Sequence, residues 1–202
     1  MIIGAVLGAF FFAAAGYLGS LAGLWYAERI EALPDAPASG KAPIGLLIAA
    51  CAVIGAVVTT HGTQGQVLLM AVICVALVAI WITDTMRGVV PDVFTLGPLG
   101  LILLLAVWQH EWFIFFSAAV PFVPFAVAAV LSKGRGMGWG DVKMVALGGA
   151  LLGAQTSVLV FALACIVAVI LNYARGHRTG PIAFAPYLAA AIGVAIPLGI
   201  LR

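Results

Sequence analysis

The sequence predicts an all-α fold: a polytopic membrane helical bundle of about eight transmembrane helices, in a single domain covering residues 1–202. Three observations predict it. The chain is 65% hydrophobic and only 8% charged, and its mean hydropathy of +1.24 lies far above the range of soluble globular proteins. Eight apolar stretches approach the roughly 20 residues that a helix needs to cross a bilayer. Eight of the nine basic residues occur in alternate connecting stretches.

The candidate spans follow one another with short connections. They lie at residues 2–26, 44–60, 67–83, 93–109, 112–131, 144–155, 157–173 and 182–201. The first span has no positively charged region before it, so we expect a retained helix rather than a cleaved signal peptide. The polar, Pro- and Ala-rich stretch 27–43 is expected to be a short cytoplasmic linker.

Residues 144–173 allow two interpretations. They could form one helix of about 45 Å at 1.5 Å per residue, or two helices separated by a turn in the polar stretch 153–157. A single helix would place Arg175 and Arg178 on the side opposite to the other basic residues. We therefore favour two helices.

The basic residues predict the orientation. Eight of the nine fall in connecting stretches on one side of the predicted bundle: Arg29, Lys41, Arg87, Lys133, Arg135, Lys143, Arg175 and Arg178. By the positive-inside rule this side is the cytoplasm, so both termini are expected outside. The net charge of +2, without a basic cluster, gives no indication of a nucleic-acid partner.

The three cysteines, Cys51, Cys74 and Cys165, all lie inside apolar segments, and none belongs to a Cys-x-x-Cys pair. They therefore predict neither a metal site nor a disulfide framework. We expect them to be small core residues.

Two polar stretches, 82–92 and 138–143, interrupt the apolar spans and bring one aspartate each to the predicted cytoplasmic boundary. Asp84 ends the third span and Asp141 precedes the sixth. Acids at such positions are often only solvated charges, although ionisable groups near membrane depth are enriched in function. Two facing aspartates can hydrolyse a peptide bond without a metal, because one activates water and the other protonates the leaving group.

The motifs in these stretches resemble those of a known family. Asp-(x)6-Pro-Asp at 84–92 is followed by Gly-x-Gly-Asp-x-Lys at 138–143 and by a proline-flanked segment at 181–188, in which Ala185 replaces a glycine. In this order they resemble the type IV prepilin peptidases, which are membrane aspartic proteases of the Gly-x-Gly-Asp class. The resemblance covers about residues 65–202.

The resemblance implies that Asp84 and Asp141 are the catalytic pair and that no cofactor or metal takes part. The implied substrate is the N-terminal leader of a prepilin or pseudopilin, whose apolar helix lies in the bilayer. The protein would then serve a type IV pilus or a protein-secretion system, in the bacterial inner membrane, with its active site facing the cytoplasm.

Four neighbouring residues are implied to support the pair. Gly138 and Gly140 would shape the turn before Asp141 and allow close backbone approach. Asp92 would have a structural or substrate-positioning role. Lys143 could pair with Asp92 or with the catalytic acid that precedes it, or be an ordinary positive-inside lysine.

Longer family members carry a cytoplasmic insertion with paired Cys-x-x-Cys motifs after the first membrane segment, and many of them also N-methylate the cleaved pilin. Here only the linker 27–43 stands at that place, and it contains no cysteine. The chain therefore resembles a short form of the family, and we expect a peptidase without N-methyltransferase activity.

The helix ends predict different roles for the two acids. Exposed carbonyls at a helix C-terminus disfavour negative charge, and free N–H groups at an N-terminus favour it. Asp84 lies at a predicted C-terminus and Asp141 at a predicted N-terminus, in an N-cap-like position. We therefore expect a shared proton to reside mainly on Asp84, which leaves Asp141 as the base.

Two other classes of function remain possible from the sequence. A small proton-coupled transporter would be expected to carry acids in mid-span and a repeat between its halves, whereas here the acids lie at span boundaries and no internal period is visible. A non-catalytic pilus assembly factor could retain the peptidase fold. The presence of both aspartates favours the enzyme.

Overall fold

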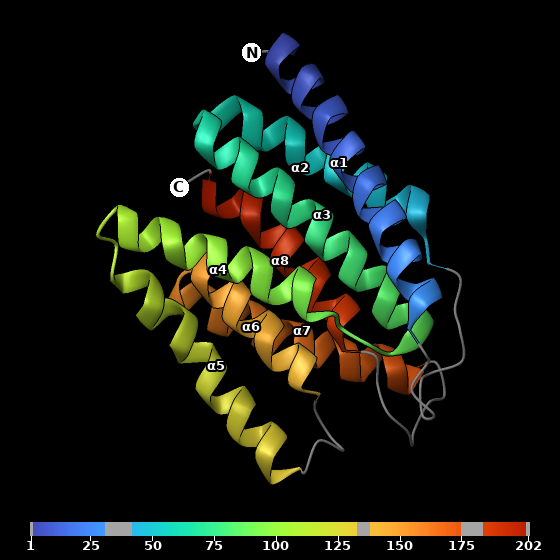
Figure 1. Ribbon diagram of the computed structural model, residues 1–202, viewed down its shortest axis with the longest axis vertical. Helices are drawn as coiled ribbons and strands as arrows, with labels where there is room; N and C mark the ends of the chain where they lie inside the picture. The colour runs from blue at the N-terminus through green and yellow to red at the C-terminus, as the bar shows by residue number, and fades with distance from the viewer. Residues whose placement is uncertain (1, 31–41, 133–137, 175–183, 201–202) are drawn as a thin grey trace.

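The computed structural model describes residues 2–30, 42–132, 138–174 and 184–200, and these residues form eight α-helices and no strand. The helices are α1 (Ile2–Arg29), α2 (Ile44–His61), α3 (Gln64–Arg87), α4 (Asp92–Trp108), α5 (Phe113–Leu131), α6 (Trp139–Leu152), α7 (Ala154–Ala174) and α8 (Ala185–Ile200). The predicted all-α bundle is confirmed (Figure 1).

Five of the helices, α1, α2, α3, α5 and α7, are long and apolar enough to cross a membrane. Helices α4 and α8 are apolar but shorter, and α6 has only 14 residues, fewer than the roughly 20 that a straight crossing requires. The chain is thus a multi-pass membrane protein in which some helices are shorter than the bilayer is thick.

The break between α6 and α7 is a single residue. Gly153 adopts a positive φ of 79° and donates its N–H to the carbonyl of Gly149. Glycine tolerates this backbone conformation, and α7 begins at the next residue. The prediction of two helices over 144–173 is confirmed, but α6 begins at Trp139, five residues before the predicted start.

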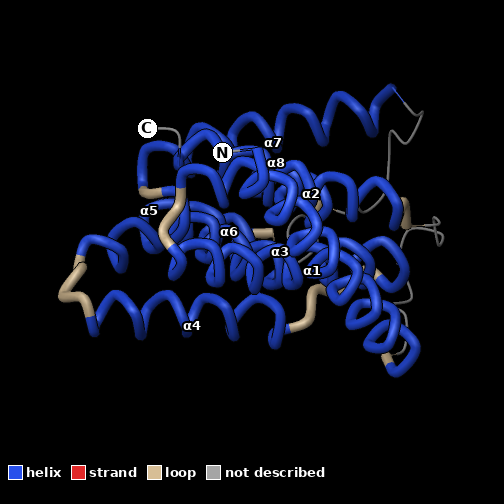
Figure 2. The backbone as a smooth tube through the Cα atoms, turned by 90° about the horizontal axis from the view of Figure 1, so that it is seen from above, coloured by secondary structure: helices blue, strands red, loops and turns tan. Residues whose placement is uncertain are grey.

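Helix α3 is the centre of the bundle. It packs against α1, α2, α4 and α8, and three of its isoleucines, Ile73, Ile80 and Ile82, are fully buried. Figure 1 shows α1 and α2 on one side of it and α4, α6 and α5 on the other; Figure 2 shows α7 on the face of the bundle opposite α4. The helix begins after its N-cap residue Thr63, which forms a reciprocal capping box with Gln66.

Small residues let α1 approach its neighbours closely. A Cβ atom added to Gly19 would lie 2.6 Å from the carbonyl oxygen of Val75 in α3. A Cβ atom added to Gly55 in α2 would lie 2.5 Å from the carbonyl oxygen of Gly8 in α1. Such contacts stabilise helix pairs where lipid removes the hydrophobic drive for association.

Exposed tryptophans mark the two ends of the bundle. Trp108 and Trp112 flank the turn between α4 and α5. At the opposite end of the bundle (Figure 1), Trp25 near the end of α1 stacks under the Arg29 guanidinium, which lies 3.6 Å from the ring centroid. Tryptophans at both ends are typical of the two membrane–water interfaces.

Several sequence-based predictions concern residues outside those that the structure describes. These are most of the linker 27–43, the first three residues of the 181–188 segment, and five of the basic residues that predict the orientation: Lys41, Lys133, Arg135, Arg175 and Arg178.

Candidate active site

Asp84 lies one turn before the end of α3 and is only 6% exposed. Its helix ends at Gly88, which adopts a left-handed conformation with φ 68° and donates its N–H to the backbone carbonyl of Asp84. The side-chain oxygen Oδ2 of Asp84 is buried without a hydrogen-bond partner. A buried polar atom without a partner is costly, and such atoms are common where a protein acts on a ligand.

Asp141 lies in the first turn of α6 and is partly buried. It occupies the third helical position rather than the N-cap-like position expected from the sequence, because Gly138 is the N-cap. Its Oδ2 accepts a hydrogen bond from the Gly138 N–H at 3.3 Å. Both this bond and the helix N-terminus favour a negative charge on Asp141.

The helices that carry the two aspartates, α3 and α6, share two neighbouring helices, α4 and α8. Among the described residues, α3 and α6 do not pack directly on each other. The first turn of α6 is instead held against the α3–α4 connection, by Gly140 against Val90 and by Lys143 with Asp92, which brings Asp141 to the end of α3 that carries Asp84. No hydrogen bond between the two carboxyl groups is present in the described part of the chain.

Gly140 lets the first turn of α6 lie against the loop between α3 and α4. A Cβ atom on Gly140 would lie 2.6 Å from the Cβ of Val90, so a side chain there would force the two segments apart. Gly138 is different: its φ is −77°, and the nearest atom to an added Cβ would be Asp141 Oδ2, 3.5 Å away. The Gly-x-Gly pattern thus marks the start of a helix and not a turn with positive φ. Among the described residues, the glycines with positive φ are Gly88 and Gly153.

Lys143 pairs with Asp92, the first residue of α4. Its Nζ lies 2.6 Å from Asp92 Oδ1, with the two side chains 28% and 60% exposed. This contact selects one of the alternatives that the sequence left open. It ties the N-terminus of α6 to that of α4, two residues after Asp141.

Arg87 makes a contact that sequence reasoning missed. Its Nε donates a hydrogen bond of 2.7 Å to the carbonyl of Ala27 near the end of α1. The bond joins the end of α3, close to Asp84, to the end of α1. No local pattern signals it, because the two residues are 60 positions apart.

The described part of the third motif belongs to the core. Ala185 begins α8, and both Ala185 and Leu188 are fully buried. The Tyr187 hydroxyl accepts a weak hydrogen bond of 3.4 Å from the Asn172 side chain of α7. This segment therefore positions α8, on which both aspartate-bearing helices pack.

Comparisons with known proteins agree with these observations. The model of the type IV leader peptidase family matches residues 71–173, a span that contains both Asp84 and Asp141. Two curated proteins, from Aeromonas salmonicida strain A449 and from Aeromonas salmonicida, are each named prepilin leader peptidase/N-methyltransferase and are 29% identical to this chain over 201 residues.

The aligned region covers 89% of this chain and 65% of each relative, so the chain spans somewhat less than two thirds of the length of the curated proteins it matches. No solved structure matches the chain. Because the family model covers more than half of the sequence, the chain belongs to the type IV leader peptidase family.

Proposed function

We propose that the protein is an aspartic endopeptidase that removes the leader peptide of a prepilin or pseudopilin at the cytoplasmic face of the bacterial inner membrane. One observation carries the proposal: Asp84, buried and with its Oδ2 unpartnered, lies at the end of α3 beside the connection against which Gly140 and Lys143 hold the first turn of α6 and its Asp141. Both acids lie inside the region that matches the leader peptidase family.

Asp141 is the general base in this proposal. The Gly138 N–H and the N-terminus of α6 stabilise its negative charge, whereas Asp84 has no donor on Oδ2 and lies near a helix C-terminus. The shared proton therefore resides mainly on Asp84, and the pair titrates as one coupled unit.

The reaction then follows general acid–base catalysis. A water molecule between the acids gives a proton to Asp141, and its oxygen bonds to the carbonyl carbon of the scissile peptide. The C–N bond breaks as the leaving nitrogen takes the proton of Asp84. The products are a carboxylic acid on the leader, which then releases its proton to solvent, and a free amine on the mature chain, and the dyad returns to its starting state by moving one proton from Asp141 to Asp84.

The location of the dyad suits a substrate that is half in the bilayer. The distribution of Lys and Arg supports a cytoplasmic location for the boundary that carries Asp84 and Asp141. An apolar substrate helix in the membrane would hold its preceding leader on that same side. The scissile bond would then lie level with the two acids.

The proposal is limited to peptide cleavage. The linker 27–43 contains no cysteine, whereas the family members that resemble this chain and also methylate carry Cys-x-x-Cys pairs at that place. We therefore propose that the mature pilin leaves this enzyme with an unmodified amine, which mass spectrometry of its N-terminus can measure.

The test of the proposal is co-expression with a prepilin from the same genome, followed by a gel-shift assay for leader removal. Asp84→Asn and Asp141→Asn are expected to abolish the shift at unchanged membrane abundance, and Asp92→Asn to retain it. Loss with Asp92→Asn and retention with Asp84→Asn would move the first acid to the Pro-Asp motif. Cleavage by all three variants would exclude the two-aspartate mechanism.

A further inference from the structure

An apolar groove of about 620 Å³ lies between α2, α3 and α8. Leu47 and Cys51 of α2, Cys74 and Trp81 of α3, and Ala190 and Gly193 of α8 are among the residues that line it. Its rim is open to the surroundings of the bundle, since Leu46, Val53 and Val194 are about two-thirds exposed. In a membrane protein this rim faces the bilayer.

Internal packing does not account for the glycine in this groove. A Cβ atom added to Gly193 would meet only Ile54 Cδ1, at an ordinary 3.6 Å. A Cβ atom added to Gly149 in α6, by contrast, would lie 2.5 Å from the Ser117 carbonyl oxygen of α5. Gly149 is needed for contact within the bundle, whereas the space beside Gly193 is open to an external molecule.

The shape of the lining favours a helix as that molecule. Ala189, Ala190 and Gly193 form a small-residue strip on α8, and such strips allow the backbone of a second helix to approach closely. A lipid acyl chain has no backbone and gains nothing from a glycine. The groove extends over about eight residues of each of its helices, roughly 12 Å at 1.5 Å per residue, which is about two turns of a bound helix.

The groove leads to the dyad. Trp81, at one end of it, lies one turn before Asp84 on α3. The other residues at this end, Leu46 on α2 and Ala189 on α8, are the third and fifth residues of their helices. A helix bound here would therefore have one end beside Asp84 and would run from there toward the middle of the bundle.

We propose that this groove binds the apolar helix of the substrate and so positions the peptide bond that precedes the helix between Asp84 and Asp141. The inference rests on the proposed peptidase function. It adds a binding site for the part of the substrate that is not cleaved. The enzyme would thus select its substrates by an apolar helix as well as by the sequence around the scissile bond.

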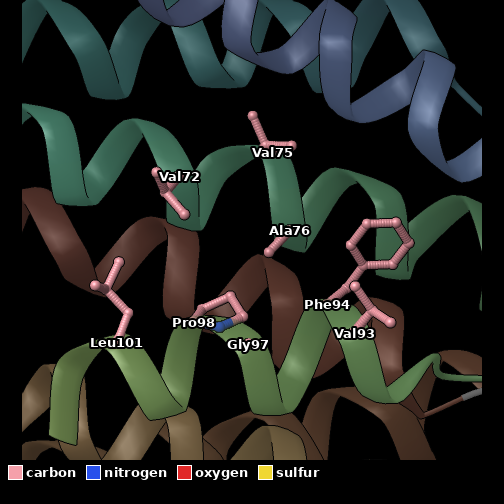
Figure 3. Close-up of a pocket in the computed structure, with 8 residues that line it drawn as sticks. All are labelled: Val72, Val75, Ala76, Val93, Phe94, Gly97, Pro98 and Leu101. Carbon is pink, nitrogen blue, oxygen red and sulfur yellow. The ribbon is translucent and has the colours of Figure 1, made fainter. Parts of the chain in front are cut away.

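A second apolar cavity offers a matched control. It has a volume of about 250 Å³ and lies between α3 and α4 (Figure 3), lined by Val72, Phe94 and Gly97 among others. An added Cβ on Gly97 would meet no atom within 4 Å. Leucine can therefore replace Gly97 or Gly193 without a clash at Cβ, and each substitution fills a different cavity.

The first experiment measures cleavage of two substrates by the full-length enzyme in membranes. One substrate is the complete prepilin, and the other is a leader peptide that ends before the apolar helix. Gly193→Leu is expected to slow cleavage of the complete prepilin about tenfold, the equivalent of an ordinary overpacking penalty, and to leave cleavage of the short peptide unchanged. Gly97→Leu is expected to change neither rate.

Equal slowing of both substrates by Gly193→Leu would show damage to the active site and overturn the proposal. An unchanged rate on the complete prepilin would overturn it too. If the wild-type enzyme cleaves neither substrate, the proposed function itself fails, and the docking inference fails with it.

The second experiment detects the bound helix directly. In a chain whose three native cysteines are replaced by alanine, Val53→Cys or Val194→Cys is expected to form a disulfide with a cysteine in the apolar helix of a co-expressed prepilin when copper phenanthroline is added. Val158→Cys, on the exposed surface of α7, is expected to form none. Cleavage without any crosslink at the groove would reject the docking site while the peptidase function stands. Crosslinks between two copies of the enzyme would instead assign the groove to a dimer.

Discussion

The C-terminal end of α3 and the N-terminal end of α6 each present one aspartate, yet they are held in place differently. Asp84 is fixed by its own helix, which is buried at the centre of the bundle and ends at a left-handed Gly88. Asp141 lies at the start of a short, partly exposed helix. Its position depends on contacts with the α3–α4 connection and with the start of α4, through Gly140 against Val90 and through the pair Lys143–Asp92.

The segment that follows Asp84 therefore also positions Asp141. Residues 88–92 end α3, provide the surface for Gly140 and begin α4 with the carboxylate that binds Lys143. This explains in physical terms why the first aspartate and the Pro-Asp pair occur in one continuous motif. Changes in the segment are expected to alter the distance between the acids rather than the chemistry of either one.

The largest expected effect comes from removing either acid. Asp84→Asn and Asp141→Asn should each reduce the rate of leader cleavage by about 10²–10⁴-fold, the usual contribution of a general acid or base. The purified enzyme with a prepilin in detergent gives this rate directly. Membrane abundance of Asp84→Asn should not fall, since the amide is a neutral group of nearly the same size and shape as the mainly protonated carboxyl group that it replaces. A variant that loses activity only because it fails to accumulate would not support the assignment.

The second-largest expected effect is a difference in cleavage rate between substitutions of Gly140 and of Gly138. Gly140→Ala places a Cβ 2.6 Å from that of Val90 and should slow cleavage about tenfold, a loss typical of overpacking. Gly138→Ala, whose Cβ has room and whose φ suits alanine, should change the rate by less than about twofold. Rates measured at equal enzyme concentration compare the two variants.

A second substitution checks the cause of the Gly140 effect. Val90→Gly removes the atom that the new Cβ would meet, so the double variant Gly140→Ala/Val90→Gly should recover part of the lost rate, whereas additive losses would indicate no contact. If Gly138→Ala is as harmful as Gly140→Ala, the Val90 contact is not what the motif requires.

The smallest effect is expected at the ion pair. Lys143→Met should slow cleavage about two- to fivefold, because an exposed pair contributes only about 0.2–1 kcal/mol. Asp92→Asn should have an effect of similar size, and the double variant should be no worse than either single one. High salt should reduce the wild-type rate toward that of the variants and leave the variants unchanged. A loss above about a hundredfold for Lys143→Met would instead indicate a contact with the substrate.

The sequence alone predicted eight helices, and seven of them begin within about three residues of their observed start. The reason is that helix formation in a membrane is local: a run of apolar residues must satisfy its own backbone, and the helix is the structure that does so. The sequence also predicts the break at Gly153, because polar residues interrupt the apolar run there. The start of α6 was predicted five residues late, since hydropathy does not record a helix that continues through Trp139 and Lys143 into the interface.

The motif order also indicated which acids to consider, and the charge pattern indicated at which end of the bundle they lie. Three kinds of contact are visible only in the tertiary structure. They are the ion pair of Lys143 with Asp92 and the hydrogen bond from Arg87 to the carbonyl of Ala27. The third is the room beside each glycine: a Cβ on Gly140 would meet Val90, whereas a Cβ on Gly193 would meet almost nothing. These contacts depend on how each helix is rotated about its axis and which neighbour it packs against. In an apolar helix that is surrounded by lipid and by other apolar helices, hydropathy is nearly the same on every face, so the sequence pattern leaves that rotation undetermined.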